Sequence, residues 1–339
     1  MAGRTGIAFD ERMLAHDAGP GHPERPERLR ALLQHLEGAT GVQRLGSQLA
    51  TAEDLALVHD PRVIEFLAGT ALRPRTVIDP DTATSAGSWD AARLAVGCLL
   101  TTCDAVLAGQ VDTGFALVRP PGHHAEYDRP MGFCLLNNVA IAAAWLRQRG
   151  LGRVAIIDWD LHHGNGTQHL FEHDPNVLYV STHQYPYYPG TGAVTDVGLG
   201  AGAGATLNLP FPVGFGDAEF RRAFDEVIVP VVRQFAPEFV LISAGFDCDG
   251  RDPLGGLTVT PGGIGYMTRV LQEVAAETAR GRVVAVLEGG YDLDAIVEGV
   301  DAVLGVLQGQ SAPPVVGHGE AVVPVLAAVR AAQAAYWRF

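Results

Sequence analysis

Cysteine is scarce in this sequence. The chain of 339 residues contains 4 cysteines, Cys98, Cys103, Cys134 and Cys248, and no two of them form a CxxC pair. So few thiols in so long a chain do not define a disulfide framework. We therefore expect reduced cysteines, as in a protein of the cytoplasm.

Basic residues are also in short supply. Lys and Arg number 24 against 38 Asp and Glu, which gives a formal net charge of −14, and no basic block occurs. Binding to nucleic acid is therefore not expected, because it needs clustered cations against the phosphates. An acidic surface would tolerate cationic ligands such as polyamines and lysine-rich peptides.

Long apolar runs are missing as well. No run approaches the ~18 residues of a membrane span, and the first residues, MAGRTGIAFD, lack the apolar core of a signal peptide. We therefore expect no membrane partner and predict a cytoplasmic location.

Hydrophobic residues, by contrast, are plentiful at 47%, and they recur in short continuous runs. Such runs are typical of strands buried on both faces of a parallel sheet. Helical patterns lie between them and before them. This alternation predicts one α/β domain over residues 1–339, a mostly parallel multi-stranded sheet flanked by helices. The runs are TGFALV at 113, RVAIID at 153, VLYVST at 177, TLNLPF at 206, FVLISAG at 239 and RVVAVLEGG at 282.

Polar side chains with catalytic potential gather where these runs end. In parallel α/β sheets, ligands bind outside the carboxyl ends of the strands, so such a cluster predicts a site. In chain order, the residues at or after five run ends are His123 and His124; Asp158, Asp160, His162 and His163; Ser181, Thr182 and His183; Asp247; and Glu288 and Tyr291.

Asp160 and His162 stand two residues apart, so in an extended segment both point to one side and can share a cation. Asp247, from another strand, is the candidate third ligand. Two carboxylates and one imidazole leave positions open for water and substrate, as in catalytic zinc sites. The alternative is a hydrogen-bond network without a metal.

At these residues the chain resembles a known family. The blocks RPPGHHA, GFCLLNNVA, IDWDLHHGNGTQ, YVSTHQ, YPGTG, ISAGFDCDGRDPLGG and LEGGYD occur in this order, and HPERPERL precedes them. They are similar to the signature blocks of the histone deacetylase superfamily. This group of zinc amidohydrolases includes acetylpolyamine amidohydrolases and bacterial deacetylase-like enzymes.

The resemblance implies one Zn²⁺ per chain, bound by Asp160, His162 and Asp247, with Fe²⁺ as the alternative ion. It makes His123 and His124 the tandem histidines that transfer protons, and Tyr291 the hydroxyl that polarises the substrate carbonyl. Asp158 is expected to orient the ring of His123. All seven positions carry a residue competent for its role.

Structural K⁺ is also implied by the resemblance. The first site takes Asp158 and Ser181 with the backbone carbonyls of Asp160, His162 and Thr182. A second takes carbonyls near Phe171, Asp174 and Val177.

Asn165 departs from the class I members of the family, where an aspartate commonly backs the second histidine. Class II and many bacterial members carry asparagine there. A neutral amide stabilises an imidazolium less than a carboxylate does, so we expect the pKa of His124 to be the lower of the pair and His124 to be the neutral base.

The substrate channel of the family is matched by Gly132 and Phe133 in GFC and by Tyr188 in YPYYPG. Asp81, in DPDTATS, corresponds loosely to the rim aspartate that holds the substrate backbone. Polyamine-specific class II members carry a glutamate where this chain has Leu254. A leucine cannot attract a secondary ammonium, which favours acyl-lysine as the substrate.

The function we predict is therefore removal of an acetyl or similar short acyl group from the side chain of acyl-lysine. The alternative is a deacetylase of acetylpolyamines or other small acetylated amines. A non-catalytic binder of acyl-lysine is a further reading, and the resemblance also allows a homo-oligomer.

Two other classes of hydrolase are alternatives to a deacetylase. The HxxEH motif of inverted zinc proteases occurs at His169 to His173, although five residues match readily by chance. An arginase-like binuclear manganese site could use Asp247 and Asp249, but Gly164 stands where its ligand run needs a carboxylate.

Overall fold

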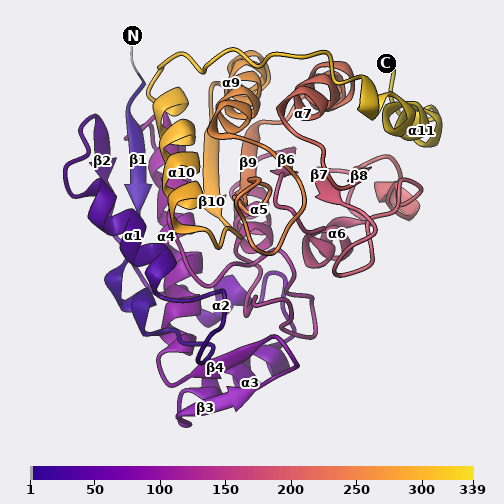
Figure 1. The fold of residues 1–339 in the computed structure, drawn as a ribbon. Coiled ribbons are helices and arrows are strands. Elements are labelled where there is room, and N and C mark those ends of the chain that lie inside the picture. Colours follow the sequence, from indigo (N-terminus) through magenta and orange to yellow (C-terminus); the bar gives the residue numbers. More distant parts are fainter. Residues whose placement is uncertain (1–2) are drawn as a thin grey trace.

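The computed structural model describes residues 3–339 and contains one eight-stranded sheet in the order β2-β1-β5-β10-β9-β6-β7-β8 (Figure 1). Every neighbouring pair in it is parallel. A separate antiparallel hairpin pairs β3 with β4. The strands are β1 (Thr5–Ala8), β2 (Val42–Arg44), β3 (Arg75–Val77), β4 (Ala83–Ser85), β5 (Thr113–Ala116), β6 (Val154–Asp158), β7 (Val177–Gln184), β8 (Thr206–Phe211), β9 (Phe239–Ala244) and β10 (Val283–Leu287).

The six apolar runs that we interpreted as strands form β5 to β10, so the predicted parallel sheet is confirmed. Every residue of β6, β7, β9 and β10 is buried, as expected for strands covered on both faces. Strands β1 to β4 were not predicted, because each is only three or four residues long.

Helices cover both faces of the sheet. On one face α4 packs on β1, β5 and β10, α5 on β6 and β9, and α6 on β7. On the other, α9 and α10 pack on β9, β10 and β5, and α1 lies against α10. The helices are α1 (Glu27–Leu36), α2 (Ala52–Leu55), α3 (Pro61–Thr70), α4 (Ser88–Leu107), α5 (Asn138–Gln148), α6 (Asn165–Phe171), α7 (Asp217–Ala223), α8 (Val229–Phe235), α9 (Pro261–Thr278), α10 (Leu293–Leu307) and α11 (Val323–Gln333).

The helical pattern at 217–235 predicts one helix, but α7 and α8 are joined by a π-helical turn, Phe224–Ile228. Pro230 explains it, because proline has no N–H for the carbonyl of Glu226 and its ring crowds that carbonyl. Arg330 lies beside the freed group, with Nη2 3.4 Å from the Glu226 carbonyl and 2.6 Å from its carboxylate.

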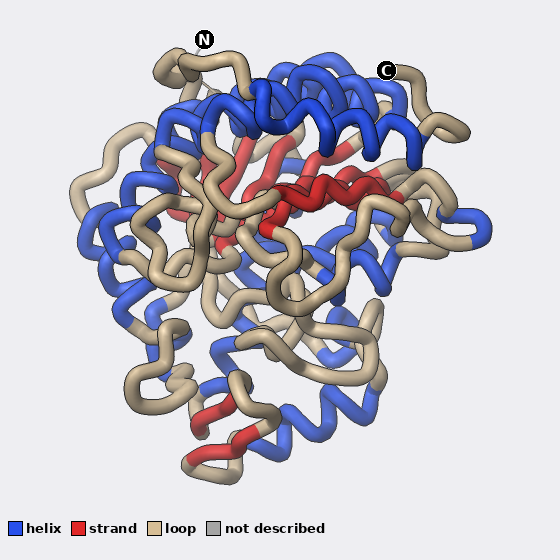
Figure 2. The backbone as a smooth tube through the Cα atoms, turned by 45° about the vertical axis from the view of Figure 1, so that its right-hand side comes forward, coloured by secondary structure: helices blue, strands red, loops and turns tan. Residues whose placement is uncertain are grey.

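The carboxyl ends of the parallel strands face the half of the molecule that holds the β3–β4 hairpin (Figure 1). Figure 2 shows the strands in the upper half and loops gathered between them and that hairpin. These loops carry the predicted site. Within residues 3–339, none of the helices is both long and apolar enough to cross a membrane.

Candidate active site

Five strands that are consecutive in the sheet, β5, β10, β9, β6 and β7, deliver the predicted residues to one edge. The register keeps their ends level, since Asp158 at the end of β6 pairs with Ser181 of β7 and with Ser243 of β9. The loops that follow can therefore converge above the sheet. This convergence places residues from distant parts of the sequence together.

Asp160, His162 and Asp247 form a buried cluster whose ligand atoms all lie within 4.8 Å of one another. His162 Nδ1 is 3.3 Å from Asp160 Oδ1 and 3.1 Å from Asp247 Oδ2. It is the one His/Cys/Asp/Glu group with metal-ligating geometry within residues 3–339.

The two buried carboxylates of this cluster would be stabilised by a bound cation. Burial, together with the charge of Asp160, raises the pKa of Asp247 to about 7. Burial would lower the pKa of His162, but its hydrogen bonds to Asp160 and Asp247 raise it to about 9. Two carboxylates thus compete for the proton of one imidazole, and a divalent ion would neutralise both. The donor set fits such an ion.

Backbone groups fix the two carboxylates. Gly289 N donates to Asp160 Oδ2 at 2.8 Å, and Leu161 N donates to Asp247 Oδ1 at 2.9 Å. A Cβ at position 289 would lie 2.3 Å from Asp247 Oδ2, so only glycine allows this approach.

The tandem histidines lie beside the cluster with their rings 4.0 Å apart. His123 Nδ1 donates to Asp158 Oδ2 at 3.0 Å, and His124 Nδ1 faces Asn165 Oδ1 at 2.8 Å. Asp158 also accepts from the hydroxyl of Tyr179, at 3.0 Å. Each histidine therefore has its own backing residue.

The pKa values of the two histidines are shifted in opposite directions. Burial opposes the charged form of His123, but the carboxylates of Asp160 and Asp158 raise its pKa to about 10. Burial and the neighbouring charges of His123 and His162 hold the pKa of His124 well below its usual range. These shifts favour the charged form of His123 and the neutral form of His124.

Tyr291 reaches the site from the loop after β10. Arg28 holds that loop, because its Nε and Nη2 each donate at 2.5 Å to the carbonyls of Gly290 and Glu288. The same guanidinium lies 4.9 Å from the centre of the Tyr291 ring, a cation–π contact. Burial raises the pKa of Tyr291 well above its usual range, so the hydroxyl keeps its proton.

Aromatic side chains surround these groups. The ring of Phe133 packs edge-on at 5.7 Å from that of Tyr291. Tyr188 packs edge-on at 5.2 Å from His124 and at 6.0 Å from His162. Of the two aromatic residues that we assigned to the channel, Phe133 therefore contacts Tyr291, and Tyr188 contacts the histidines.

Asp81 and Leu254, which we assigned to the rim, make contacts with residues around the site. Asp81 Oδ1 accepts from Thr82 Oγ1 at 2.8 Å, and Thr82 Oγ1 accepts from Phe133 N at 3.1 Å, so Asp81 borders the channel wall. Leu254 is half-buried, and its carbonyl accepts from the hydroxyl of Tyr187 at 2.8 Å.

The groups assigned to K⁺ lie in two places. Asp158 and Ser181 are paired across β6 and β7, with Thr182 next along the strand. Phe171 ends α6, Val177 begins β7, and Asp174 lies in the turn between them, where its N–H donates to the carbonyl of Phe171 at 2.8 Å.

The structure disfavours both competing hydrolase classes. A Cβ at Gly164 would lie 2.4 Å from Asp158 Oδ2, so the carboxylate that an arginase-like site needs has no room. The carboxylate of Asp249 pairs instead with Arg251 at 2.9 Å. Helix α6 ends at Phe171, so the helical spacing that HxxEH requires does not reach His173.

The contacts of two buried glutamates complete the site: Glu126 was not predicted, and Glu288 was predicted only as a residue at the end of an apolar run. Glu126 accepts from the Asn165 amide, and Glu288 accepts from the backbone of Gly122 and His123. Glu126 directly follows the block RPPGHHA and Glu288 lies inside LEGGYD, which is the signal that was available. Their partners become visible only once the loops are folded together.

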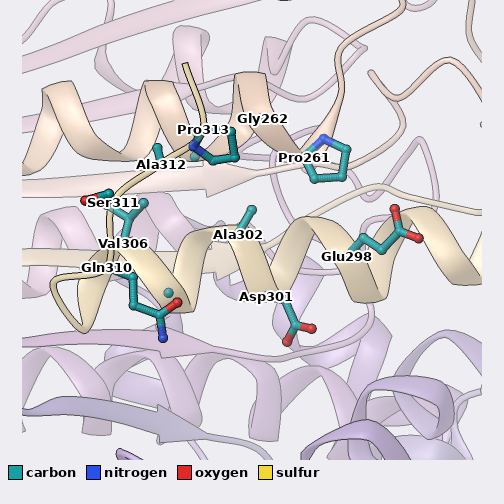
Figure 3. A pocket seen from close by; sticks show the side chains of 12 residues that line it. Pro261, Gly262, Glu298, Asp301, Ala302, Val306, Gln310, Ser311, Ala312 and Pro313 are labelled. Carbon is teal, nitrogen blue, oxygen red and sulfur yellow. The ribbon is translucent and has the colours of Figure 1, made fainter. Parts of the chain in front are cut away.

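A groove between α9 and α10, of about 430 Å³, lies apart from this site (Figure 3). Pro313 borders it on one side and Glu298 and Asp301 on the other. Those carboxylates are paired with Arg251 and His35. None of the predicted site residues lines this groove.

The fold and the site define a metal-dependent hydrolase of amide bonds. The sequence model of the histone deacetylase domain matches residues 22–307. A probable deacetylase of Archaeoglobus fulgidus is 44% identical over 295 residues, 86% of this chain and 82% of that protein. The crystal structure of the HDA15 HD domain has 40% sequence identity and a TM-score of 0.91, covering 99% of this chain and 95% of that one. The chain belongs to the histone deacetylase family and is a deacetylase.

Relatives within the family differ in their named substrates. Histone deacetylase 15 of Arabidopsis thaliana is 42% identical over 321 residues, 91% of this chain. The human polyamine deacetylase HDAC10 is 42% identical over 339 residues, 93% of this chain. The chain spans about half the length of these two proteins, 57% and 49% respectively. Overall identity therefore does not distinguish a protein substrate from a polyamine.

Gly132 offers a direct test of the packing around His124. Its φ is +58°, and an added Cβ would lie 2.5 Å from His124 Cδ2. We expect Gly132→Ala to lower kcat/KM about tenfold, because the histidine ring must shift from its reactive position. Gly150→Ala is the matched control, with φ +88° and open space around the Cβ. Equal losses of activity in both variants would contradict this assignment.

Proposed function

We propose that this chain is a zinc-dependent deacetylase that removes an acetyl group from the side chain of acetyl-lysine in peptides. The observation that carries the proposal is the buried Asp160–His162–Asp247 cluster with His124 and Tyr291 buried beside it. The direction of their pKa shifts favours a neutral imidazole on His124 and a protonated hydroxyl on Tyr291. These are the groups that hydrolysis of an unactivated amide requires. The products are acetate and a free amine.

Asp160, His162 and Asp247 would hold the zinc ion. When bound there, Zn²⁺ would lower the pKa of a water molecule and polarise the acetyl carbonyl. His162 serves as a ligand in its neutral form, so ion binding displaces the proton that it shares with the two carboxylates.

His124 is the group suited to move protons. Its Nδ1 is held by Asn165, and its Nε2 has no hydrogen-bond partner among residues 3–339. Nε2 can therefore accept the proton of the attacking water and pass it to the departing amine nitrogen. His123 keeps its positive charge beside Asp158 and Asp160, where it favours the negative charge that develops on the substrate.

Tyr291 would donate a hydrogen bond to the acetyl oxygen as it becomes an oxyanion. Its hydroxyl has no hydrogen-bond partner among residues 3–339, and the raised pKa keeps the proton on it. Arg28 and Phe133 fix the ring from two sides. A donor that is held in place before the reaction contributes most to the transition state.

The rim supports acetyl-lysine over acetylated polyamines. Leu254 presents an apolar side chain, so a secondary ammonium finds no partner at this position. Asp81, beside the channel wall, could accept from the backbone N–H groups of a peptide.

Acetate release from a competing mixture tests this proposal. Acetyl-lysine peptides, free acetyl-lysine and acetylated polyamines are supplied together, and each product is quantified. We expect the peptides to be used preferentially. Preference for polyamines would overturn the substrate assignment, and no acetate from any of them would overturn the proposal as a whole.

Leu254→Glu should move this preference towards polyamines. A rim carboxylate paired with a secondary ammonium is worth up to about 1 kcal/mol, so we expect the ratio of kcat/KM for polyamine over peptide to rise about fivefold. Leu254→Gln has the same shape without the charge and is the control. If the two variants behave alike, the charge at this position does not select the substrate.

A further inference from the structure

The amide of Asn165 can face His124 in two orientations that are not equivalent, unlike a carboxylate at this position. One end of an amide accepts hydrogen bonds and the other donates them, whereas both oxygens of a carboxylate accept. His124 is useful as a base at Nε2 only if Nδ1 carries the proton, which requires the amide oxygen to face it. Something must therefore hold the amide in one of its two orientations.

Glu126 contacts the other end of that amide. Asn165 Nδ2 donates to Glu126 Oε1 at 2.6 Å, while the remaining acceptors near it, the His124 carbonyl and Met131 Sδ, are both 3.4 Å away. The Glu126 side chain is 8% exposed. A buried ionised carboxylate can only accept, so it selects the NH₂ end of the amide.

Glu126 is itself held in its ionised form. His169, four residues after Asn165 on α6, faces it with Nδ1 at 2.9 Å and 3.0 Å from the two oxygens. Burial opposes the charge of Glu126, but the hydrogen bonds from His169 and Asn165 outweigh it and lower the pKa of the carboxyl. The His169 side chain is 40% exposed, so the chain of contacts runs from the surface to His124.

We propose that Glu126 is a positioning residue: it orients the Asn165 amide so that Oδ1 faces His124, which fixes the proton on Nδ1 and leaves Nε2 free to accept one. The inference rests on the proposed role of His124 as the base. It assigns His169, the first residue of the HLFEH stretch, a supporting role in place of metal binding. It also explains how a neutral amide can replace a carboxylate behind a catalytic histidine.

Nitrogen-15 NMR of zinc-loaded protein labelled on histidine tests the inference without any substrate. The signals of His124, identified by their loss in His124→Phe, should show a protonated Nδ1 and an unprotonated Nε2 in the wild type. In Glu126→Gln, whose amide accepts either orientation of Asn165, the Nε2-protonated form should appear. A protonated Nε2 in the wild type, or no change in Glu126→Gln, would overturn the proposal.

Steady-state kinetics of the same variant provide a second test of the inference. We expect Glu126→Gln to lower kcat/KM about tenfold with little change in KM, of the order of one lost hydrogen bond. In an Asn165→Asp background either oxygen can face His124 and two carboxylates would repel each other, so Glu126→Gln should there be neutral or beneficial. Equal losses in both backgrounds would indicate a merely structural role and contradict the proposal.

Glu172→Gln is the matched control, because it removes a nearby charge without a contact to Asn165. It should leave both the NMR signals and kcat/KM unchanged. Failure of the proposed function remains distinguishable from failure of this inference. A protein that releases no acetate, but whose His124 proton lies on Nδ1 in the wild type and appears on Nε2 in Glu126→Gln, would refute the function and support the role of Glu126.

Discussion

Replacing Tyr291 with phenylalanine is expected to lower kcat about 10²–10³-fold, the usual cost of removing one donor to an oxyanion. The substitution removes only a hydroxyl. The ring keeps its contacts with Arg28 and Phe133, so the loop after β10 should stay in place. We expect KM to change little, because the hydrogen bond strengthens mainly in the transition state. Steady-state kinetics with an acetyl-lysine peptide provide the measurement.

Tyr266→Phe is the control for this experiment. It also removes one hydroxyl, which bonds to Asp225 on the π-helical turn outside the candidate site. Its kcat should match that of the wild type. A Tyr291→Phe enzyme that retained more than about a tenth of the wild-type kcat would show that another group stabilises the oxyanion.

The second large effect is expected from Asp247→Asn. The asparagine oxygen can still accept from Leu161 N, while its NH₂ group would face His162 where a ligand oxygen is needed. We expect activity to fall at least about 10³-fold, since a bound metal ion contributes several kcal/mol and each ~1.4 kcal/mol is a factor of ten. Metal content, measured on the same samples, should fall in parallel.

Asp249→Asn distinguishes a site for one metal ion from a binuclear site. Asp249 lies two residues further on, and its carboxylate pairs with Arg251. Activity and metal content should therefore match the wild type. Loss of one of two bound ions in Asp249→Asn would instead favour the arginase-like arrangement.

Most of the sheet could be predicted because β5 to β10 each overlap a continuous apolar run of at least six residues. The runs at 153, 239 and 282 can be predicted as strands without knowledge of their tertiary contacts, because continuous apolar sequence indicates burial on both faces of a sheet. Strands β1 and β2 are different. TGIA and VQR are too short to show a pattern, and they become strands only because β5 and its neighbours extend the sheet to them.

The site was predictable for a related reason. Parallel strands place their carboxyl ends at one edge, so His124, Asp160, Asp247 and Tyr291 could be grouped before their distances were known. The contact between Glu126 and Asn165 could not be predicted in this way. It depends on how the start of α6 packs against the loop after β5, which no local pattern encodes. The stacking of Arg28 on Tyr291 likewise joins residues 263 positions apart.

Acetate release during titration of metal-free protein with Zn²⁺ shows directly whether Asp160, His162 and Asp247 form a catalytic site for a single zinc ion. The substrate is an acetyl-lysine peptide, and Asp247→Asn is titrated alongside. We expect no activity before Zn²⁺ is added, recovery that saturates at one ion per chain, and no recovery in Asp247→Asn. Acetate release by the metal-free protein, or saturation at two ions per chain, would contradict this assignment.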